Sequence, residues 1–234
     1  MGHHGAMRIT LALILGLLLA QVARAEPDSF GLGSGRDGVL TVVKGSVAFI
    51  SDAAPLKQSV AAGALALTVP GLKVGAGDLV MIHTSIGLLP APVLGSAKAV
   101  ALDATVVGRW ELARLGAVDA TTGVLKLTQS LRFAYAATRS QVLRVPEYSD
   151  VIVEAGGRLS VTPWDGRSGG ILAMLVSGKL VNDGTIDADG AGFRGGTFLN
   201  HPVIMGCTGF AVAEADGGAA RGEGVAGTVS GGGG

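Results

Sequence analysis

Glycine turns separate short aliphatic strands between Val151 and Gly190, and this spacing constrains the fold more than any other feature. Three triplets in this stretch place a turn glycine and a polar residue before an aliphatic residue: Gly157-Arg158-Leu159, Gly178-Lys179-Leu180 and Gly184-Thr185-Ile186. Repeated units of this kind are typical of a solenoid, in which each turn of chain stacks its aliphatic side chains on the turn below. We therefore expect the first turns of a right-handed parallel β-solenoid over residues 147–200.

A second group of strands is expected before the solenoid, over residues 39–146. Six aliphatic runs are separated by glycine, proline and threonine turns: Val39–Val43, Ala64–Val69, Leu79–His83, Trp110–Val118, Val124–Thr128 and Gln141–Val145. Short strands at such spacing predict a small β-barrel or sandwich-like module, and hence an all-β chain. Leu88–Pro92 is expected to be a loop, whereas Ala97–Val107 fits either a strand or a short helix.

The two ends of the chain differ in composition from the middle. Arg8, the apolar stretch Ile9–Ala20 and the sequence Ala23-Arg24-Ala25 predict a signal peptide over residues 1–25. This signal indicates a secreted or outer-surface protein with no membrane span after cleavage. Residues 26–38 are interpreted as a flexible leader, and residues 201–234 as a glycine-rich, partly disordered tail.

Composition and charge exclude several classes of function. The leader matches a dinucleotide-binding fingerprint at Gly33–Gly38, but it follows no expected strand and opens no helix, so no cofactor is expected. The formal net charge is zero, from 18 basic and 18 acidic residues, which argues against a nucleic-acid partner. The single cysteine, Cys207, cannot form an internal disulfide, and we favour an incidental thiol over a catalytic pair with His201.

Trp164, Asp165 and Arg167 form the candidate carbohydrate site. Both Trp110 and Trp164 could stack on a sugar ring, although sparse aromatic residues usually anchor the core of a small β domain. Trp164 is the better candidate of the two because it lies in the turn formed with Pro163 and Asp165.

Metal binding receives less support from the sequence. Asp183, Asp187 and Asp189 are weak calcium candidates, because carboxylate oxygens suit this cation. Their spacing matches no known calcium loop, so a solvated turn is the simpler interpretation. His83 is interpreted as a rim or core histidine, since no histidine pair has the spacing of metal ligands.

Several further segments resemble a family of exported, glycine-rich surface proteins similar to the adventurous-gliding-motility proteins of myxobacteria. The segments that carry this resemblance are Gly108–Arg114, Leu131–Ala136, Gln141–Tyr148, Pro163–Gly166, Gly169-Gly170, Asn182–Ile186 and Gly192–Gly196. The resemblance implies a secreted or outer-surface protein with a β module before a solenoid, linked to motility or adhesion. It implies no catalytic residues.

These observations predict an exported structural or adhesion-like surface protein without catalysis, whose partners are cell-surface polysaccharide or other surface proteins. The alternative is a carbohydrate-active solenoid enzyme, a polysaccharide lyase or hydrolase, whose catalytic coils lie beyond Gly234. Such an enzyme needs a carboxylate pair or a base facing a groove. Asp165, Asp183 and Asp187, with Arg167 or Arg194 as a basic partner, are the candidates, but nothing in the sequence fixes their separation.

Overall fold

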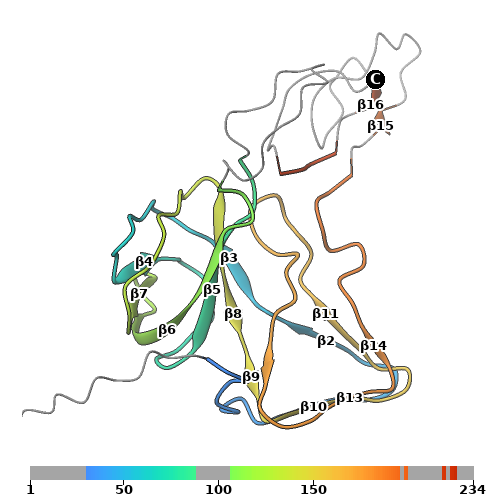
Figure 1. Ribbon diagram of the computed structural model, residues 1–234. Coiled ribbons are helices and arrows are strands. Elements are labelled where there is room, and N and C mark those ends of the chain that lie inside the picture. The colour runs from blue at the N-terminus through green and yellow to red at the C-terminus, as the bar shows by residue number, and fades with distance from the viewer. Residues whose placement is uncertain (1–29, 88–105, 196–197, 200–217, 220–221, 226–234) are drawn as a thin grey trace, which may run out of the picture. The chain divides into compact units, whose positions relative to one another are not determined.

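Every element assigned in the structure is a β-strand, which confirms the predicted all-β fold (Figure 1). This computed structural model describes residues 30–87, 106–195, 198–199, 218–219 and 222–225. None of these residues lies in a helix long and apolar enough to cross a membrane. The chain divides into two compact units, Met1–Gly31 and Leu32–Gly234, and all the strands belong to the second unit.

Parallel strands stack in three coils, as expected for a solenoid. The first row contains β1 (Val39–Val42), β10 (Asp150–Val153) and β13 (Leu180–Asn182). The second contains β2 (Val47–Ile50), β11 (Arg158–Val161) and β14 (Thr185–Ile186), and the third contains β9 (Glu147–Tyr148) and β12 (Leu175–Val176). Along the chain, β1 and β2 form the first coil, β9 to β11 the second and β12 to β14 the third. Buried aliphatic side chains from the first two coils pack inside: Val42, Ile50, Val151, Val153 and Leu159. We call this arrangement the parallel stack.

Glycines allow the backbones to approach closely where the chain turns within a coil. A β-carbon added to Gly184 would lie 2.4 Å from the carbonyl oxygen of Gly157 and 2.5 Å from that of Glu154. No other residue fits there without separating the coils. Two of the three predicted triplets stack on each other, since Arg158 pairs with Thr185 and Leu159 pairs with Ile186. The third stacks on a different part of the second coil, where Leu180 pairs with Val151.

A six-stranded antiparallel sheet forms the predicted small module. Its strands follow the order β3 (Ala53–Pro55), β8 (Ser140–Val145), β5 (Leu79–Thr84), β6 (Trp110–Asp119), β7 (Val124–Leu127) and β4 (Ala66–Thr68). The register shifts between Leu115 and Ala117, and such a bulge adds bend and twist to a strand. Figure 1 shows the sheet curling from β8 towards β7 and β4. The main core lies on one face of the sheet and includes Leu56, Leu67, Val80, Ile82, Leu115, Leu125, Tyr135 and Val142.

The sheet interrupts the parallel stack instead of preceding it. Val39–Val43 was expected in the module, but β1 pairs with β10, so this assignment is wrong and the stack begins before the module. The stack strand β2 was not predicted at all. The chain leaves the stack after β2 ends at Ile50 and re-enters it where β9 begins at Glu147. In the second coil, residues 162–174 make the corresponding connection, from β11 to β12. Alternating hydrophobicity reveals a strand but does not identify the sheet that the strand joins.

Ser51 marks the point where the chain leaves the stack. Its backbone has a positive φ of 61°, a conformation that is costly for a residue with a β-carbon. The Ser51 hydroxyl donates to the carbonyl of Ala173 at 2.7 Å and accepts from the N–H of Ala173 at 3.0 Å. One side chain thus holds the first coil against the loop that completes the second.

The glycine-rich residues before β1 are fixed against the stack. The N–H of Ser34 donates to Glu147 Oε1 at 2.8 Å, and Asp37 accepts from the N–H of Glu147 at 2.7 Å. This part of the leader therefore differs from the flexible segment that was expected.

A short antiparallel pair, β15 (Phe198–Leu199) and β16 (Gly218–Ala219), completes the assigned elements. Other expectations fall outside the described residues: the signal peptide, the Leu88–Pro92 loop, most of Ala97–Val107, His201 and Cys207. Most of the expected tail also falls outside them.

Candidate functional site

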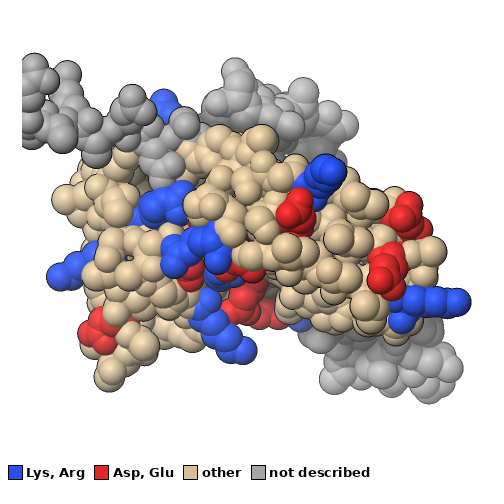
Figure 2. All heavy atoms as spheres, turned by 90° about the horizontal axis from the view of Figure 1, so that it is seen from below, with Lys and Arg blue, Asp and Glu red and all other residues tan. Residues whose placement is uncertain are grey.

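Ion pairs join the curled sheet to the parallel stack. Arg114 of β6 donates to both carboxylate oxygens of Glu147 in β9, at 2.7 and 3.1 Å. Arg144 of β8 pairs with Asp37, before β1, and with Asp78, before β5. Figure 2 shows basic and acidic side chains lying against one another at the middle of one face. Because these cations are already paired with carboxylates, the network holds the molecule together more than it offers a binding site.

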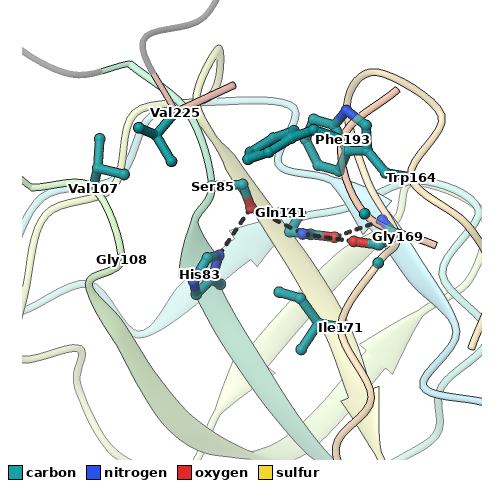
Figure 3. A pocket seen from close by; sticks show the side chains of 12 residues that line it. His83, Ser85, Val107, Gly108, Gln141, Trp164, Gly169, Ile171, Phe193 and Val225 are labelled. Atoms are coloured by element: carbon teal, nitrogen blue, oxygen red, sulfur yellow. Dashed lines mark hydrogen bonds between the residues drawn. The ribbon is translucent and has the colours of Figure 1, made fainter. Parts of the chain in front are cut away.

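A pocket of about 300 Å³ lies where the sheet meets the stack, and we call it the seam pocket (Figure 3). Strands β5 and β8 and residues beside them supply one side, while the chain after β11 supplies the other. Its lining residues are His83, Ser85, Val107, Gly108, Gln141, Trp164, Gly169, Gly170, Ile171, Gly192, Phe193 and Val225. This volume is at the lower end of the range for small-molecule sites, about 300–1,000 Å³.

Gln141 ties the two sides of the seam pocket together. Its buried amide donates to the carbonyl of Gly169 at 3.1 Å and accepts from the N–H of Gly169 at 2.8 Å. The same amide nitrogen donates to the hydroxyl of Ser85 at 2.9 Å. Ser85 Oγ also lies 2.9 Å from His83 Nδ1. Since Ser85 already accepts from Gln141, its hydrogen can point to Nδ1, which leaves the proton of a neutral imidazole on Nε2.

Two aromatic rings form one wall of the seam pocket. Trp164 is 6% exposed and meets Phe193 edge to face, with ring centroids 5.4 Å apart and an interplanar angle of 81°. Phe193 is 39% exposed and forms the accessible part of the wall. Figure 3 shows Phe193 and Trp164 together on the side of the pocket that also carries Gly169.

An ion pair outside the lining braces this wall. Arg194 donates through Nε to Glu223 at 3.0 Å, and the N–H of Glu223 donates to the carbonyl of Arg194 at 2.8 Å. The buried indole Nε1–H of Trp164 has no hydrogen-bond partner among the described residues. Hydrogen bonding with Arg194 holds the pKa of the Glu223 carboxyl below its ordinary value.

The described lining of the seam pocket carries no formal charge at neutral pH. None of the described residues that line it is a carboxylate, a lysine or an arginine. Burial lowers the pKa of His83, so its imidazole is uncharged above its ordinary value of 6.5. The arrangement can hold an uncharged ligand through ring contacts and hydrogen bonds.

The predicted carbohydrate residues are only partly brought together at this pocket. Trp164 lines it, whereas Asp165 and Arg167 do not. Asp165 Oδ1 accepts from the N–H groups of Arg167 and Ser168 at 2.7 and 2.8 Å, so its carboxylate stabilises its own turn. The two tryptophans also differ from expectation: Trp164 is buried, whereas Trp110 is 53% exposed and does not anchor the core.

The weak calcium candidates do not converge on one cation position. Arg158 donates to both oxygens of Asp187, at 2.9 and 2.6 Å, and lowers the pKa of that carboxyl. Asp183 and Asp189 are exposed. Across the part of the chain with defined positions, no group of three or more His, Cys, Asp or Glu side chains could hold a metal ion.

A second hollow, of about 430 Å³, lies between β2 and the start of β9. It contains Phe49, Lys73, Arg144 and Tyr148 among its lining residues. Arg144 is already paired with Asp37 and Asp78. We therefore regard the seam pocket, where neutral polar groups and an aromatic wall converge, as the better candidate site.

Sequence reasoning missed His83 and Gln141 as site residues. Gln141 lies in a run of buried residues from Ser140 to Leu143, and this large polar side chain beside buried aliphatic residues was the available signal. A buried amide needs partners, but the sequence could not show that the partner was the backbone of Gly169.

Comparisons with known proteins identify distant structural likenesses. No family model matches the chain, and no curated protein matches it. The tailspike protein gp49 from Pseudomonas phage LKA1 is 15% identical, with a TM-score of 0.30 over 53% of this chain and 23% of that one. Tailspike gp61 from Pseudomonas phage phi297 is 15% identical, with a TM-score of 0.31 over 60% of this chain and 19% of that one.

A third solved structure is the gp54 tailspike of Acinetobacter baumannii bacteriophage AP22, in complex with A. baumannii capsular saccharide. It is 9% identical, with a TM-score of 0.31 over 63% of this chain and 26% of the tailspike. This chain therefore spans only 19–26% of the length of the three tailspikes.

Proposed function

We propose that this protein is an exported surface-attachment protein that binds a polysaccharide in the seam pocket without cleaving it. The observation that carries the proposal is the lining of the pocket: an aromatic wall, a neutral histidine, a serine and a glutamine, with no carboxylate among the described lining residues. Sugar rings present apolar faces and hydroxyl groups, which match an aromatic side chain and neutral hydrogen-bonding groups. The resemblance to gliding-motility surface proteins supports attachment during movement as the setting.

Phe193 provides the variant for a binding test, because it is the accessible member of the aromatic wall. The purified protein is presented with immobilised neutral and acidic polysaccharides, and retention is measured. Phe193→Ala should weaken retention. Phe49→Ala is the matched control, because Phe49 is 62% exposed on β2 and does not line the seam pocket. Equal retention of both variants and the parent protein would contradict binding in this pocket.

The alternative function is a polysaccharide lyase or hydrolase, and the same incubations discriminate it. A binding protein leaves polysaccharide length unchanged, whereas a hydrolase creates reducing ends and a lyase creates unsaturated sugars. We expect binding without either product. Accumulation of either product in proportion to the amount of protein would replace the proposed function with the enzymatic one.

A further inference from the structure

Trp110 lies beside the seam pocket on the exposed face of the sheet. It is the first residue of β6, and its register partner on β5 is His83, a pocket-lining residue. Directly opposed residues of an antiparallel pair point to the same face, with β-carbons about 5 Å apart. Gly108, two residues before Trp110, also lines the pocket. Trp110 therefore continues the pocket edge formed by His83 and Gly108.

The residues on either side of Trp110 interact on the opposite face. Glu111 is buried and accepts from the N–H groups of Arg132 and Phe133 at 2.8 and 3.2 Å. The guanidinium of Arg109 lies 4.8 Å from the centre of the Phe133 ring. These charged groups are thus engaged away from the seam pocket, and Trp110 presents an uncharged aromatic surface beside it.

The exposure of Trp110 leaves a large aromatic surface in water. At 53% exposed, it contrasts with Trp164, the other tryptophan of the chain, which is 6% exposed. A wide, rigid aromatic side chain can cover an apolar face of a ligand at low cost in conformational entropy. A pyranose ring has such a face, and it extends the ligand class already suited to the pocket.

We propose that Trp110 is an outer stacking platform of the seam pocket, which binds a second, neutral sugar ring of a glycan whose first ring occupies the pocket. This inference rests on the proposed function. The preference for a neutral glycan follows from the uncharged side chains of the described lining. It follows also from the contact of Arg109 with the Phe133 ring on the other face of the sheet. A uronate-rich chain would bring negative charge into a pocket whose described lining holds no lysine or arginine.

Tryptophan fluorescence can report this contact because the chain has only two tryptophans. In Trp164→Phe, the aromatic wall is kept and Trp110 becomes the sole emitter. The probes are neutral glucan, mannan and galactan hexasaccharides, and alginate and polygalacturonate hexasaccharides as acidic counterparts. At least one neutral probe should protect Trp110 from acrylamide quenching, whereas the acidic probes should give less protection.

Calorimetry gives a second measurement of glycan affinity that does not depend on Trp164→Phe. It compares the unmodified protein with single variants that all retain Trp164. Trp110→Ala should weaken binding of the neutral hexasaccharide by about tenfold, the size expected for losing one aromatic contact. Trp110→Phe should recover part of the affinity, and Phe49→Ala should retain all of it. Because Trp110 is largely exposed, its replacement should leave the melting temperature nearly unchanged.

The outcomes separate this inference from the function on which it rests. If a neutral probe binds and Phe193→Ala weakens it while Trp110→Ala does not, the platform is refuted and the proposed function stands. If the acidic probes bind more tightly than every neutral one, the neutral ligand class is refuted. If none of the probes binds, both the inference and the proposed function fail for these glycans.

Discussion

Glu147 is the buried charge at the contact between the sheet and the stack. Burial alone would raise the pKa of this carboxyl, but hydrogen bonds from Arg114 and from the N–H of Ser34 outweigh it and hold the pKa below its ordinary value of 4.5. Removing one partner of a buried ion pair leaves an uncompensated charge, which costs more than the pair itself contributes. The residue thus couples three parts of the chain: the leader, the sheet and the second coil.

The depressed pKa of Glu147 predicts acid sensitivity. Its contribution to the free energy of unfolding is fully present above pH 4.5 and is lost as the pH falls through the lower, folded-state pKa. Glu147→Gln should lower the free energy of unfolding at neutral pH by about 3 kcal/mol. It should also flatten the dependence on pH below 4.5.

Urea unfolding at a series of pH values measures both effects. Glu154→Gln is the control, because Glu154 is an exposed carboxylate that accepts one hydrogen bond from the N–H of Lys44. A pH dependence that is the same for Glu147→Gln and for the unmodified protein would contradict the assigned role of Glu147.

At the scale of strands, the parallel register was predictable where glycine fixed it. Gly157 and Gly184 allow the coils to touch, so the spacing of their triplets was enough to predict stacked turns. The sheet to which β1 belongs was not predictable, because the hydrophobic pattern of Val39–Val42 is the same whether this strand pairs with β10 or with a strand of the module. The candidate site was harder to predict than the strands. The sequence identified Trp164, but it could not identify Gln141, whose partner Gly169 lies far away in the sequence.

A designed disulfide tests the position of β1 in the stack. Thr41 and Ile152 are register partners with exposed side chains. Neighbouring strands lie about 4.8 Å apart, within the range of α-carbon separations that a disulfide spans, about 4.4–6.8 Å. Thr41→Cys with Ile152→Cys, in a Cys207→Ser background, should cross-link under mild oxidation, as followed by non-reducing electrophoresis.

The matched control pairs Thr41→Cys with Val181→Cys, which lies one strand further along the same row. This pair should remain reduced, because two strand spacings exceed the reach of a disulfide. Cross-linking in the control but not in the test pair would contradict the register.

At the scale of the whole molecule, the sheet and the stack are joined by ion pairs and hydrogen bonds, which break if the two parts move apart. The ion pairs of Arg114 and Arg144 cross the seam, as does the amide of Gln141 with Gly169. A stack of three coils is also near the minimum at which repeating units are stable. The sheet inserted between the first two coils should therefore unfold together with the stack.

The two tryptophans report this coupling separately. Trp110 lies in the sheet and Trp164 follows β11 of the stack. Trp164→Phe and Trp110→Phe each retain one fluorescent tryptophan. The urea unfolding transitions followed by the fluorescence of the two variants should have the same slope and only slightly different midpoints. Circular dichroism on each variant is the internal control. A fluorescence transition well separated from the circular-dichroism transition of the same variant would show that the sheet and the stack unfold independently.

Hydrogen exchange with and without a bound neutral glycan tests the central claim most directly, because it locates the ligand without a mutation. We predict that the glycan slows exchange in peptides containing Ser85, Gly108, Gly169 and Phe193, which meet at the seam pocket. Peptides from β13 and β14, on the third coil, should exchange at unchanged rates. Protection confined to those third-coil strands, with none at the seam, would contradict the account.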